Sequence, residues 1–573
     1  MILFTRRGFT AGLLAAASPV AVARAQRGAL DFPPVTPVTA RHGMVVTQET
    51  RATRIGVDVL RRGGNAVDAA VAVGFALAVT YPRAGNIGGG GFMLIHLTKE
   101  NRQTAIDYRE TAPAATTRDV FLDPKGEADP QKSRELGLAI GVPGTVAGLA
   151  LAHQKYGSGK FRLADLIAPA LVMAREGIRV DDDLADSLPF ARPRLARWPS
   201  SAKIFLRPDG NALAAGDTLV QRDLAATLDA IARRGPRAFY EGPIAEKIAT
   251  AVRAAGGRMT AEDLKNYRVI ERAPLRGTYR GHDIVTMPPS SSGGVLLIQM
   301  LNMLEGDTLK ANDPATLHLM IETMKLAYAD RAKFLGDPEF INAPIAGLIS
   351  KRYAAARRAT IDLTRARPAA DIAPGEPPRE GDNTTHYSIV DRFGNVVANT
   401  YTLNLSYGVG MVADGTGVLL NNELDDFAAK PGVPNAFGLI GLDEANAPGP
   451  IKRPLSSMTP AIVFRGGKPV LVTGSPGGSR IITAVLQVLL NVMNLNMNIG
   501  AAVGAPRLHH QWLPDQVLIE RGAPAAILKS LEVLGHRITM APPGTSAHSI
   551  AIGPGRLTGA ADTRTRGSLA AGY

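Results

Sequence analysis

The chain has 573 residues, of which 45% are hydrophobic and 20% charged, with a formal net charge of +13 at pH 7. It is long enough for one large globular domain or several of average size. The sequence contains no cysteine, which excludes disulfides, thiolate metal centres, iron–sulfur clusters and a cysteine nucleophile. There is no dense Lys/Arg run with interleaved aromatics and no apolar run of bilayer-spanning length, so we expect neither a nucleic-acid nor a membrane partner.

The first 25 residues have the pattern of an export signal, which we expect not to belong to the fold. Basic residues at the start, an Ala/Leu/Gly-rich apolar stretch and the small-residue site Ala23-Arg24-Ala25 follow one another in the order of a secretory signal peptide. The start, Thr5-Arg6-Arg7-Gly8-Phe9-Thr10, resembles a twin-arginine signal. An amphipathic or anchoring helix is the alternative interpretation. We expect residues 1–25 to be removed and the protein to be exported to a bacterial periplasm.

Helical and strand patterns alternate in the first part of the mature chain. Helices are predicted over residues 49–62 and 66–80, and the second is apolar on nearly every face, so we expect it to be buried. A glycine-rich run at 85–91 precedes a β-hairpin over 92–108. Residues 135–350 are predicted to be mostly helical.

The pattern changes after an exposed loop at 364–383, which is rich in Pro, Arg, Asp and Gly. Two β-hairpins are predicted next, over 386–402 and 461–473, and an apolar helix follows over 481–493. Helices, then hairpins, then helices indicate an α+β fold built in layers.

A threonine stands where this loop meets the first strand, in Asn383-Thr384-Thr385-His386. A hydroxyl is a weak nucleophile unless a base lies within hydrogen-bonding distance. One solution is a threonine at the N-terminus of its own chain, where the free α-amine is the base. This solution requires a precursor that is cut before Thr384, and an exposed loop leading into a strand suits such a cut. On the local pattern alone, a structural threonine at a strand start is the commoner interpretation.

Several short motifs are spread in order over nearly all of the mature chain. They are Gly85 to Gly91, Tyr108 to Pro113, Asn383 to Ser388, Thr400 to Asn404, Leu420 to Phe427, Arg453 to Met458, Thr473 to Arg480 and Ala570 to Tyr573. In order and spacing these motifs resemble those of the γ-glutamyltransferase (γ-glutamyltranspeptidase) family. The resemblance implies the N-terminal-nucleophile hydrolase fold, a four-layer αββα sandwich. It also implies a large subunit of residues 26–383 and a small, catalytic subunit of residues 384–573, which together form one intertwined domain.

The resemblance assigns the catalytic roles. Thr384 would be the nucleophile, which attacks the carbonyl of Asn383 during self-cleavage and the substrate afterwards. Thr402 would orient the Thr384 hydroxyl. The backbone N–H groups of Gly477 and Gly478 would form the oxyanion hole, which stabilises the negative charge that develops on the attacked carbonyl oxygen. A tight turn at a helix start is the simpler interpretation of these two glycines, and both interpretations are compatible.

The resemblance also assigns the residues that bind substrate. A γ-glutamyl group carries an α-carboxylate and an α-ammonium, so its pocket needs both signs of charge. The implied partners are Arg109, Ser456 and Ser457 for the carboxylate and Asp426, Asn404 and Glu423 for the ammonium. Judged on local sequence alone, Arg109 and Asp426 would be solvated surface charges.

Residues 428–449 match a lid loop that covers the pocket in some members of this family. The aromatic residue of that lid that faces the pocket is commonly Tyr or Trp, and here it is Phe437. A phenyl ring covers the site but cannot hydrogen-bond to Asn404, so we expect a lid without that gating bond.

These roles predict an enzyme without cofactor or metal that cleaves γ-glutamyl amide bonds in glutathione and related compounds. The γ-glutamyl group would pass to water or to an amino acid or peptide acceptor. A cephalosporin acylase and a poly-γ-glutamate processing enzyme are alternatives with the same fold, and Asp426 argues against the acylase because a substrate without an α-ammonium has no use for it. A non-catalytic periplasmic binding protein or an exported redox protein are alternatives from other classes. The adjacent pair His509-His510 lacks metal-ligand spacing, and we assign it no site.

Overall fold

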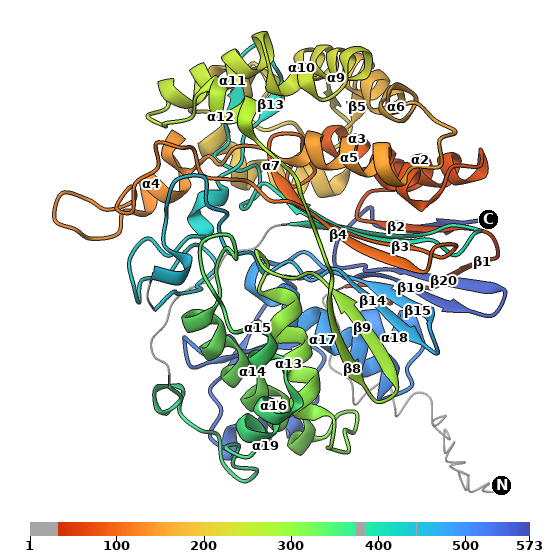
Figure 1. The fold of residues 1–573 in the computed structure, drawn as a ribbon, viewed down its shortest axis with the longest axis vertical. Coiled ribbons are helices and arrows are strands. Elements are labelled where there is room, and N and C mark those ends of the chain that lie inside the picture. The colour runs from red at the N-terminus through yellow and green to blue at the C-terminus, as the bar shows by residue number, and fades with distance from the viewer. Residues whose placement is uncertain (1–31, 374–383, 443) are drawn as a thin grey trace, which may run out of the picture.

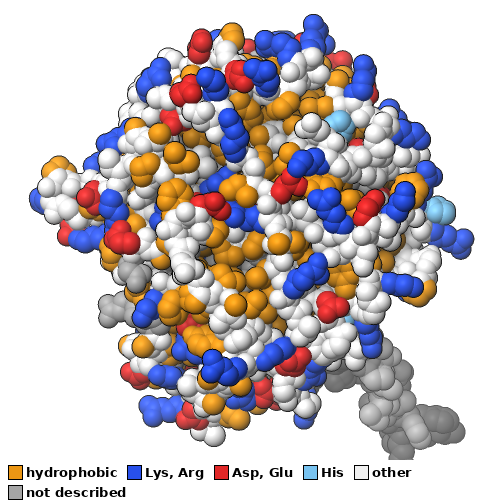
Figure 2. Space-filling view, viewed as in Figure 1, with side chains coloured by type: hydrophobic (Ala, Val, Ile, Leu, Met, Phe, Trp, Pro, Cys, Tyr) orange, Lys and Arg blue, Asp and Glu red, His pale blue; other side chains and the backbone are white. Residues whose placement is uncertain are grey.

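Two β-sheets packed between two layers of helices form the protein, in a computed structural model that describes residues 32–373, 384–442 and 444–573 (Figure 1). The expected signal segment and Asn383 lie outside the described residues. Within the described ranges, no helix combines the length and the apolar character needed to cross a membrane. On the face shown in Figure 2, Lys and Arg side chains are scattered among acidic and apolar ones and do not gather into one patch.

The sheet beneath the upper helices of Figure 1 carries the predicted nucleophile, and its strand order is β21-β2-β10-β11-β3-β4-β7. Its strands are β2 Met44–Thr47, β3 Gly90–Leu97, β4 Arg102–Tyr108, β7 Ile270–Arg272, β10 Thr385–Val390, β11 Val396–Thr402 and β21 Leu569–Gly572. Every pair is antiparallel. In the β10–β11 hairpin, Thr385 pairs with Tyr401, and the same register sets Thr384 opposite Thr402.

The second sheet packs against the first and has the strand order β1-β20-β19-β15-β14-β9-β8. Its strands are β1 Val38–Ala40, β8 Leu275–Tyr279, β9 His282–Thr286, β14 Ala461–Arg465, β15 Lys468–Thr473, β19 His548–Gly553 and β20 Arg556–Ala561. Both sheets therefore combine strands from before and after the predicted cut.

The helices cover the outer faces of the two sheets (Figure 1). The upper part contains α2 Thr50–Arg61, α3 Ala66–Thr80, α4 Pro130–Arg134, α5 Thr145–Tyr156, α6 Leu163–Glu176, α7 Asp182–Leu195, α8 Pro199–Phe205, α9 Arg222–Arg234, α10 Arg237–Tyr240, α11 Pro243–Ala254 and α12 Ala261–Asn266. The lower part contains α13 Gly293–Leu304, α14 Pro314–Phe334, α15 Ile345–Leu348, α16 Lys351–Arg358, α17 Ile481–Met493, α18 Ile499–Gly504 and α19 Ala525–Val533.

Three small sheets complete the described strands. They are β5 Ile178–Arg179 with β6 Thr218–Leu219, β12 Val412–Ala413 with β13 Val418–Leu419, and β16 Leu508–His509 with β17 Val517–Ile519 and β18 Ile538–Met540. Short 3₁₀ turns lie at η1 Gly137–Ala139, η2 Ala369–Asp371, η3 Glu423–Asp426, η4 Glu444–Asn446 and η5 Gly478–Arg480.

The central helix α3 shows how the apolar pattern sets the layers. Every one of its residues is buried, as the sequence predicts. The side chain of Asn65 caps the first turn of α3 by accepting from Asp68 N, and the Asp68 carboxylate in turn accepts from the backbone N–H of Asn65. The β8–β9 hairpin is a difference, since it interrupts a region predicted to be mostly helical. Its first strand is short and polar on one face, and it is held by pairing along the sheet.

Candidate active site

Thr384 lies directly before β10 and opposite the end of β11. Its Oγ1 donates a hydrogen bond to Thr402 Oγ1 at 3.4 Å. Thr402 Oγ1 also accepts from the backbone N–H of Asn404 at 2.9 Å, which fixes its position. Both threonines are buried. The hairpin register therefore places the predicted nucleophile beside the hydroxyl predicted to orient it.

One small cavity beside Thr384 brings most of the predicted site residues together. Its lining consists of Arg109, Thr384, Thr402, Asn404, Glu423, Asp426, Phe437, Ser456, Ser457, Met458, Gly478 and Ile481. Gly477 is not part of this lining but is the neighbour of Gly478 in the chain. Residues that are more than 300 positions apart in sequence thus meet at the junction of the two sheets.

The glycine run at 88–91 permits this meeting, because the backbone of β3 passes very close to its neighbours. A Cβ on Gly89 would lie 2.1 Å from the carbonyl oxygen of Thr402. A Cβ on Gly90 would lie 2.6 Å from a carboxylate oxygen of Glu110. Any side chain at these positions would push the catalytic hairpin or the buried acid away.

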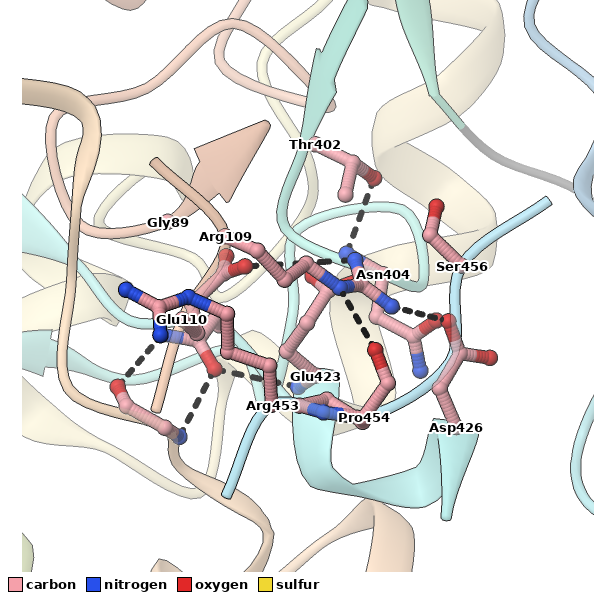
Figure 3. A network of polar contacts seen from close by, with 12 residues as sticks. Gly89, Arg109, Glu110, Thr402, Asn404, Glu423, Asp426, Arg453, Pro454 and Ser456 are labelled. Atoms are coloured by element: carbon pink, nitrogen blue, oxygen red, sulfur yellow. Dashed lines mark hydrogen bonds and ion pairs between the residues drawn. The ribbon is translucent and has the colours of Figure 1, made fainter. Parts of the chain in front are cut away.

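Arg109 lies at the centre of a buried charge cluster (Figure 3). Its side chain is 0% exposed, and its two terminal nitrogens form ion pairs with Glu423 and Asp426. Its Nε donates to the carbonyl oxygen of Pro454 at 3.1 Å. Glu110, to which the sequence assigned no role, lies 3.9 Å away and is also fully buried. One guanidinium therefore faces three carboxylates.

Burial changes the protonation of these acids. Desolvation raises the pKa of Glu110 to about 7 and that of Asp426 to about 6, although the Arg109 charge opposes both shifts. Desolvation likewise raises the pKa of Glu423 well above its usual value. Arg331 adds a second positive charge that also opposes the shift at Asp426. Burial is therefore the cause of the raised pKa values, and it favours the protonated form of these acids.

Arg109 and Asp426, which the sequence predicts to bind opposite charges of one substrate, bind each other in the structure. A zwitterionic group between them would exchange this single ion pair for two. Asn404 Oδ1 and Ser457 Oγ have no hydrogen-bond partner among the described residues. Because both residues line the cavity, their polar atoms are suited to a ligand with donors and acceptors.

A serine-rich segment at 288–292, which the sequence analysis did not connect to the site, supports the loop that carries Ser456. Ser456 donates its backbone N–H to Ser290 O at 3.0 Å, and its carbonyl accepts from Ser292 N at 2.8 Å and Ser292 Oγ at 2.7 Å. Arg331 of α14 donates to Ser292 Oγ at 3.0 Å. Arg331 of the lower helical layer thereby helps to fix the loop that carries Ser456, which lines the cavity.

The predicted lid segment is hydrogen-bonded to Asp426, the acid predicted to bind the substrate ammonium. Phe437 is buried, lines the cavity and donates its backbone N–H to Asn435 Oδ1 at 3.0 Å. Asn435 Nδ2 in turn donates to Asp426 Oδ1 at 3.3 Å. Gln511 holds the lid from the other side by donating to Gly438 O at 3.0 Å. Asn435 is a further site neighbour that the motif comparison did not single out.

The predicted oxyanion turn has a backbone that only glycine adopts easily. Gly477 has a φ of +130° and Gly478 a φ of +52°. A Cβ on Gly477 would lie 2.6 Å from the carbonyl oxygen of Gly544. The turn leads directly into α17, whose N-terminus favours negative charge. The histidines at 509 and 510 bind separate partners, Thr483 and Asp515, as expected for structural residues.

Comparison with known proteins agrees with this geometry. The Gamma-glutamyltranspeptidase family model matches residues 52–572. A glutathione hydrolase proenzyme of Escherichia coli K12 is 51% identical over 543 residues, which are 94% of this chain and 93% of the relative. A cephalosporin acylase structure from Bacillus halodurans gives a TM-score of 0.84 at 28% identity, covering 95% of this chain and 98% of that one. A Helicobacter pylori gamma-glutamyltranspeptidase chain gives a TM-score of 0.55 at 44% identity, covering 57% of this chain and 93% of that one.

The family match includes every residue that lines the cavity, from Arg109 to Ile481. The α+β fold predicted from the sequence, that of the N-terminal-nucleophile hydrolases, is confirmed by the two packed sheets and by these structural neighbours. The protein is therefore an enzyme, and it belongs to the gamma-glutamyltranspeptidase family.

Proposed function

We propose that the protein is an autoprocessing γ-glutamyl hydrolase and transferase whose substrates are glutathione and its conjugates. One observation carries the proposal: a threonine hydroxyl and a pair of opposite charges, Arg109 and Asp426, line the same cavity. This combination suits a γ-glutamyl amide, which presents a carbonyl to attack and an α-amino acid group to hold. The name of the Escherichia coli relative, glutathione hydrolase proenzyme, supports the substrate class.

Maturation begins with attack by Thr384 Oγ1 on the carbonyl carbon of Asn383. The peptide bond breaks as an ester forms, and its nitrogen becomes the α-amine of Thr384. Water then hydrolyses the ester, which leaves a carboxylate on Asn383 and restores the hydroxyl. The products are a large chain that ends at Asn383 and a small chain of residues 384–573.

Turnover uses the α-amine that the cut creates. The amine takes the proton of Thr384 Oγ1 while the oxygen attacks the γ-carbonyl carbon of the substrate. The N–H groups of Gly477 and Gly478 stabilise the oxyanion, and Thr402 keeps the hydroxyl in line. Collapse expels the amine product, which takes up the proton, and leaves a γ-glutamyl ester on Thr384. Water or the amino group of an acceptor then attacks this ester and releases the enzyme.

A cephalosporin acylase activity is the second candidate, because a protein of that name shares the fold over most of both chains. The buried acids favour the first candidate. A substrate without an α-ammonium would bring only a carboxylate to Arg109. Glu423 and Asp426 would then share this guanidinium with the substrate and gain no new positive partner.

We also propose export to a bacterial periplasm through the twin-arginine route, on the order of basic, apolar and small-residue regions in residues 1–25. Fractionation of cells that express the full chain tests this proposal. Substitution of Arg6 and Arg7 by Lys should keep the protein in the cytoplasm, and unchanged export would exclude the twin-arginine route.

Intact-mass measurement under denaturing conditions, with N-terminal sequencing of the smaller chain, tests the processing. The purified wild-type protein should give two chains, the smaller beginning Thr384-Thr385-His386. Thr384→Ala should stay uncut and inactive, whereas the matched control Thr385→Ala, at the adjacent buried threonine, should be cut. Two chains from Thr384→Ala would refute the nucleophile assignment.

The substrate class is tested on the processed enzyme with two anilides that differ only in the α-ammonium, a γ-glutamyl anilide and a glutaryl anilide. We expect a kcat/KM at least 100-fold higher for the γ-glutamyl compound, since about 3 kcal/mol is a modest value for a buried charge pair. Equal values would favour the acylase.

A further inference from the structure

A second cluster of functional side chains lies away from the active site, where α14 meets the chain between α19 and β18. His318 and Glu322 on α14 and His536 after α19 are all buried. One ligand-capable atom from each lies within 4.8 Å of the other two. His318 and Glu322 are four positions apart on one helix, so both project from the same face of α14.

Hydrogen bonds fix the orientation of His318. Its Nε2 lies 2.7 Å from the carbonyl oxygen of Asp362, which can only accept, so Nε2 carries the proton and Nδ1 presents a lone pair. That lone pair faces His536 Nε2 at 2.7 Å. A carbonyl on the far nitrogen is the usual way in which a metal-binding histidine is oriented.

His536 can supply the second nitrogen. Its Nδ1 has no hydrogen-bond partner among the described residues. The proton on Nε2, which is needed for the bond to His318, can therefore move to Nδ1 and leave Nε2 free to bind a cation. A tetrahedral ion with metal–nitrogen bonds of about 2.0 Å would separate the two nitrogens to about 3.3 Å. This change of roughly half an ångström is within the range of a small side-chain rotation.

The charges around the cluster also suit a cation. Glu322 Oε1 accepts no hydrogen bond within the described ranges, although Lys325 Nζ lies 2.8 Å away as an ion pair. Lys325 also lies 3.6 Å from Asp515 Oδ1, and His510 contacts that same aspartate at 3.2 Å. The ammonium of Lys325 is thus shared between the buried Glu322 and the partly exposed Asp515, so the Glu322 carboxylate keeps negative charge that a divalent ion would attract.

We propose that His318, Glu322 and His536 bind one divalent transition-metal ion of the zinc class. Two imidazoles and a carboxylate are a donor set that Zn²⁺ favours over Mg²⁺ or Ca²⁺. The first two ligands precede the predicted cut and the third follows it. If the chain is processed as proposed above, the ion joins the large subunit to the small one, and none of its ligands lines the cavity beside Thr384.

The test measures zinc in tag-free protein produced in zinc-depleted medium and then equilibrated with ZnCl₂. Elemental analysis should find about one zinc for each pair of large and small chains in the wild type and in the matched control His42→Gln, which alters an exposed histidine. His318→Gln and His536→Gln should weaken zinc binding by at least about 100-fold, more than loss of an outer-shell partner does. Substoichiometric zinc in the wild type, or equal loss in His42→Gln, would overturn the proposal.

Two further measurements keep the proposal testable if a histidine variant does not fold. Co²⁺ added to the wild-type protein should give the intense visible absorption of a tetrahedral site, and its absence would count against the ligand set. Zinc should also raise the Tm of the wild type in proportion to the logarithm of its concentration. The uncut Thr384→Ala chain should bind zinc equally, so a failure of the proposed processing and a failure of the metal site give different results.

Discussion

Replacing Arg109 with lysine tests the centre of the active site, because the positive charge is kept and the forked geometry is lost. In the structure one terminal nitrogen of Arg109 pairs with Glu423 and the other with Asp426. A lysine ammonium is a single point charge that cannot reproduce a two-pronged contact with a carboxylate. Loss of one charge-assisted hydrogen bond costs about 1.5–3 kcal/mol.

This free energy predicts a rise in KM of about 10- to 150-fold, at about 1.4 kcal/mol for each factor of ten. The kcat should change much less, since Thr384 and its partner Thr402 do not contact Arg109 through any bond of the described network. The assay is the initial rate of anilide release from a γ-glutamyl anilide as a function of substrate concentration. Intact-mass analysis of the same preparation should show full cleavage.

Two companion variants separate binding from stability. Arg62→Lys, whose side chain is 56% exposed, should match the wild type in every respect. Arg109→Ala should lower the free energy of unfolding by about 3–5 kcal/mol, because three buried acids lose their counter-charge. A KM for Arg109→Lys within twofold of the wild type would refute the assignment of Arg109 to the substrate carboxylate.

Three more variants address the lid, the oxyanion turn and the buried acid. Phe437→Tyr should offer a donor to Asn404 Oδ1, which has no partner in the described part of the chain, and should raise the ratio of transfer product to free glutamate several-fold, at about 1 kcal/mol per hydrogen bond; an unchanged ratio contradicts the gating argument. Gly477→Ala should lower kcat by about 10²–10³-fold with little change in KM, since its Cβ would meet Gly544 O at 2.6 Å and displace a donor; a wild-type kcat would remove Gly477 from the oxyanion hole. Glu110 has a folded pKa of about 7 against a usual 4.5, so its contribution to stability is complete below pH 4.5 and is lost as the pH rises to 7, by at most about 3 kcal/mol. Urea unfolding of Glu110→Gln should lack this decline, and identical pH slopes in both proteins would show that another group is responsible.

Local patterns predicted the elements whose burial follows from the apolar periodicity of their own residues. The apolar helix 66–80 and the hairpin 386–402 are examples, because periodicity and turn residues suffice to define them. Motif resemblance then brought distant residues to one site, and nine of the ten predicted site residues in the described ranges line the cavity, with Gly477 adjacent. The signal segment and the cut after Asn383 stay predictions.

The remainder depends on contacts that no local pattern contains. An arginine such as Arg109 is expected at the surface when judged by residue type alone. Only its pairing with residues more than 300 positions away makes it the buried centre of the site. Glu110 gains its raised pKa from the same desolvation. Asn435 acquires its role through the fold of the lid over Asp426. Each of these properties arises from tertiary packing, which overrides local preference.

The order of strands in the two sheets has a consequence for how the cut protein behaves. Strand β2 lies between β21 and β10, and β11 pairs with β3, so a cut before Thr384 would leave these three pairings between strands of different chains. Either chain alone would present unpaired strand edges, which template aggregation. The two halves could therefore not be made separately and simply mixed. For such a pair dissociation is unfolding, and a dilution experiment would measure the stability of the fold instead of an affinity.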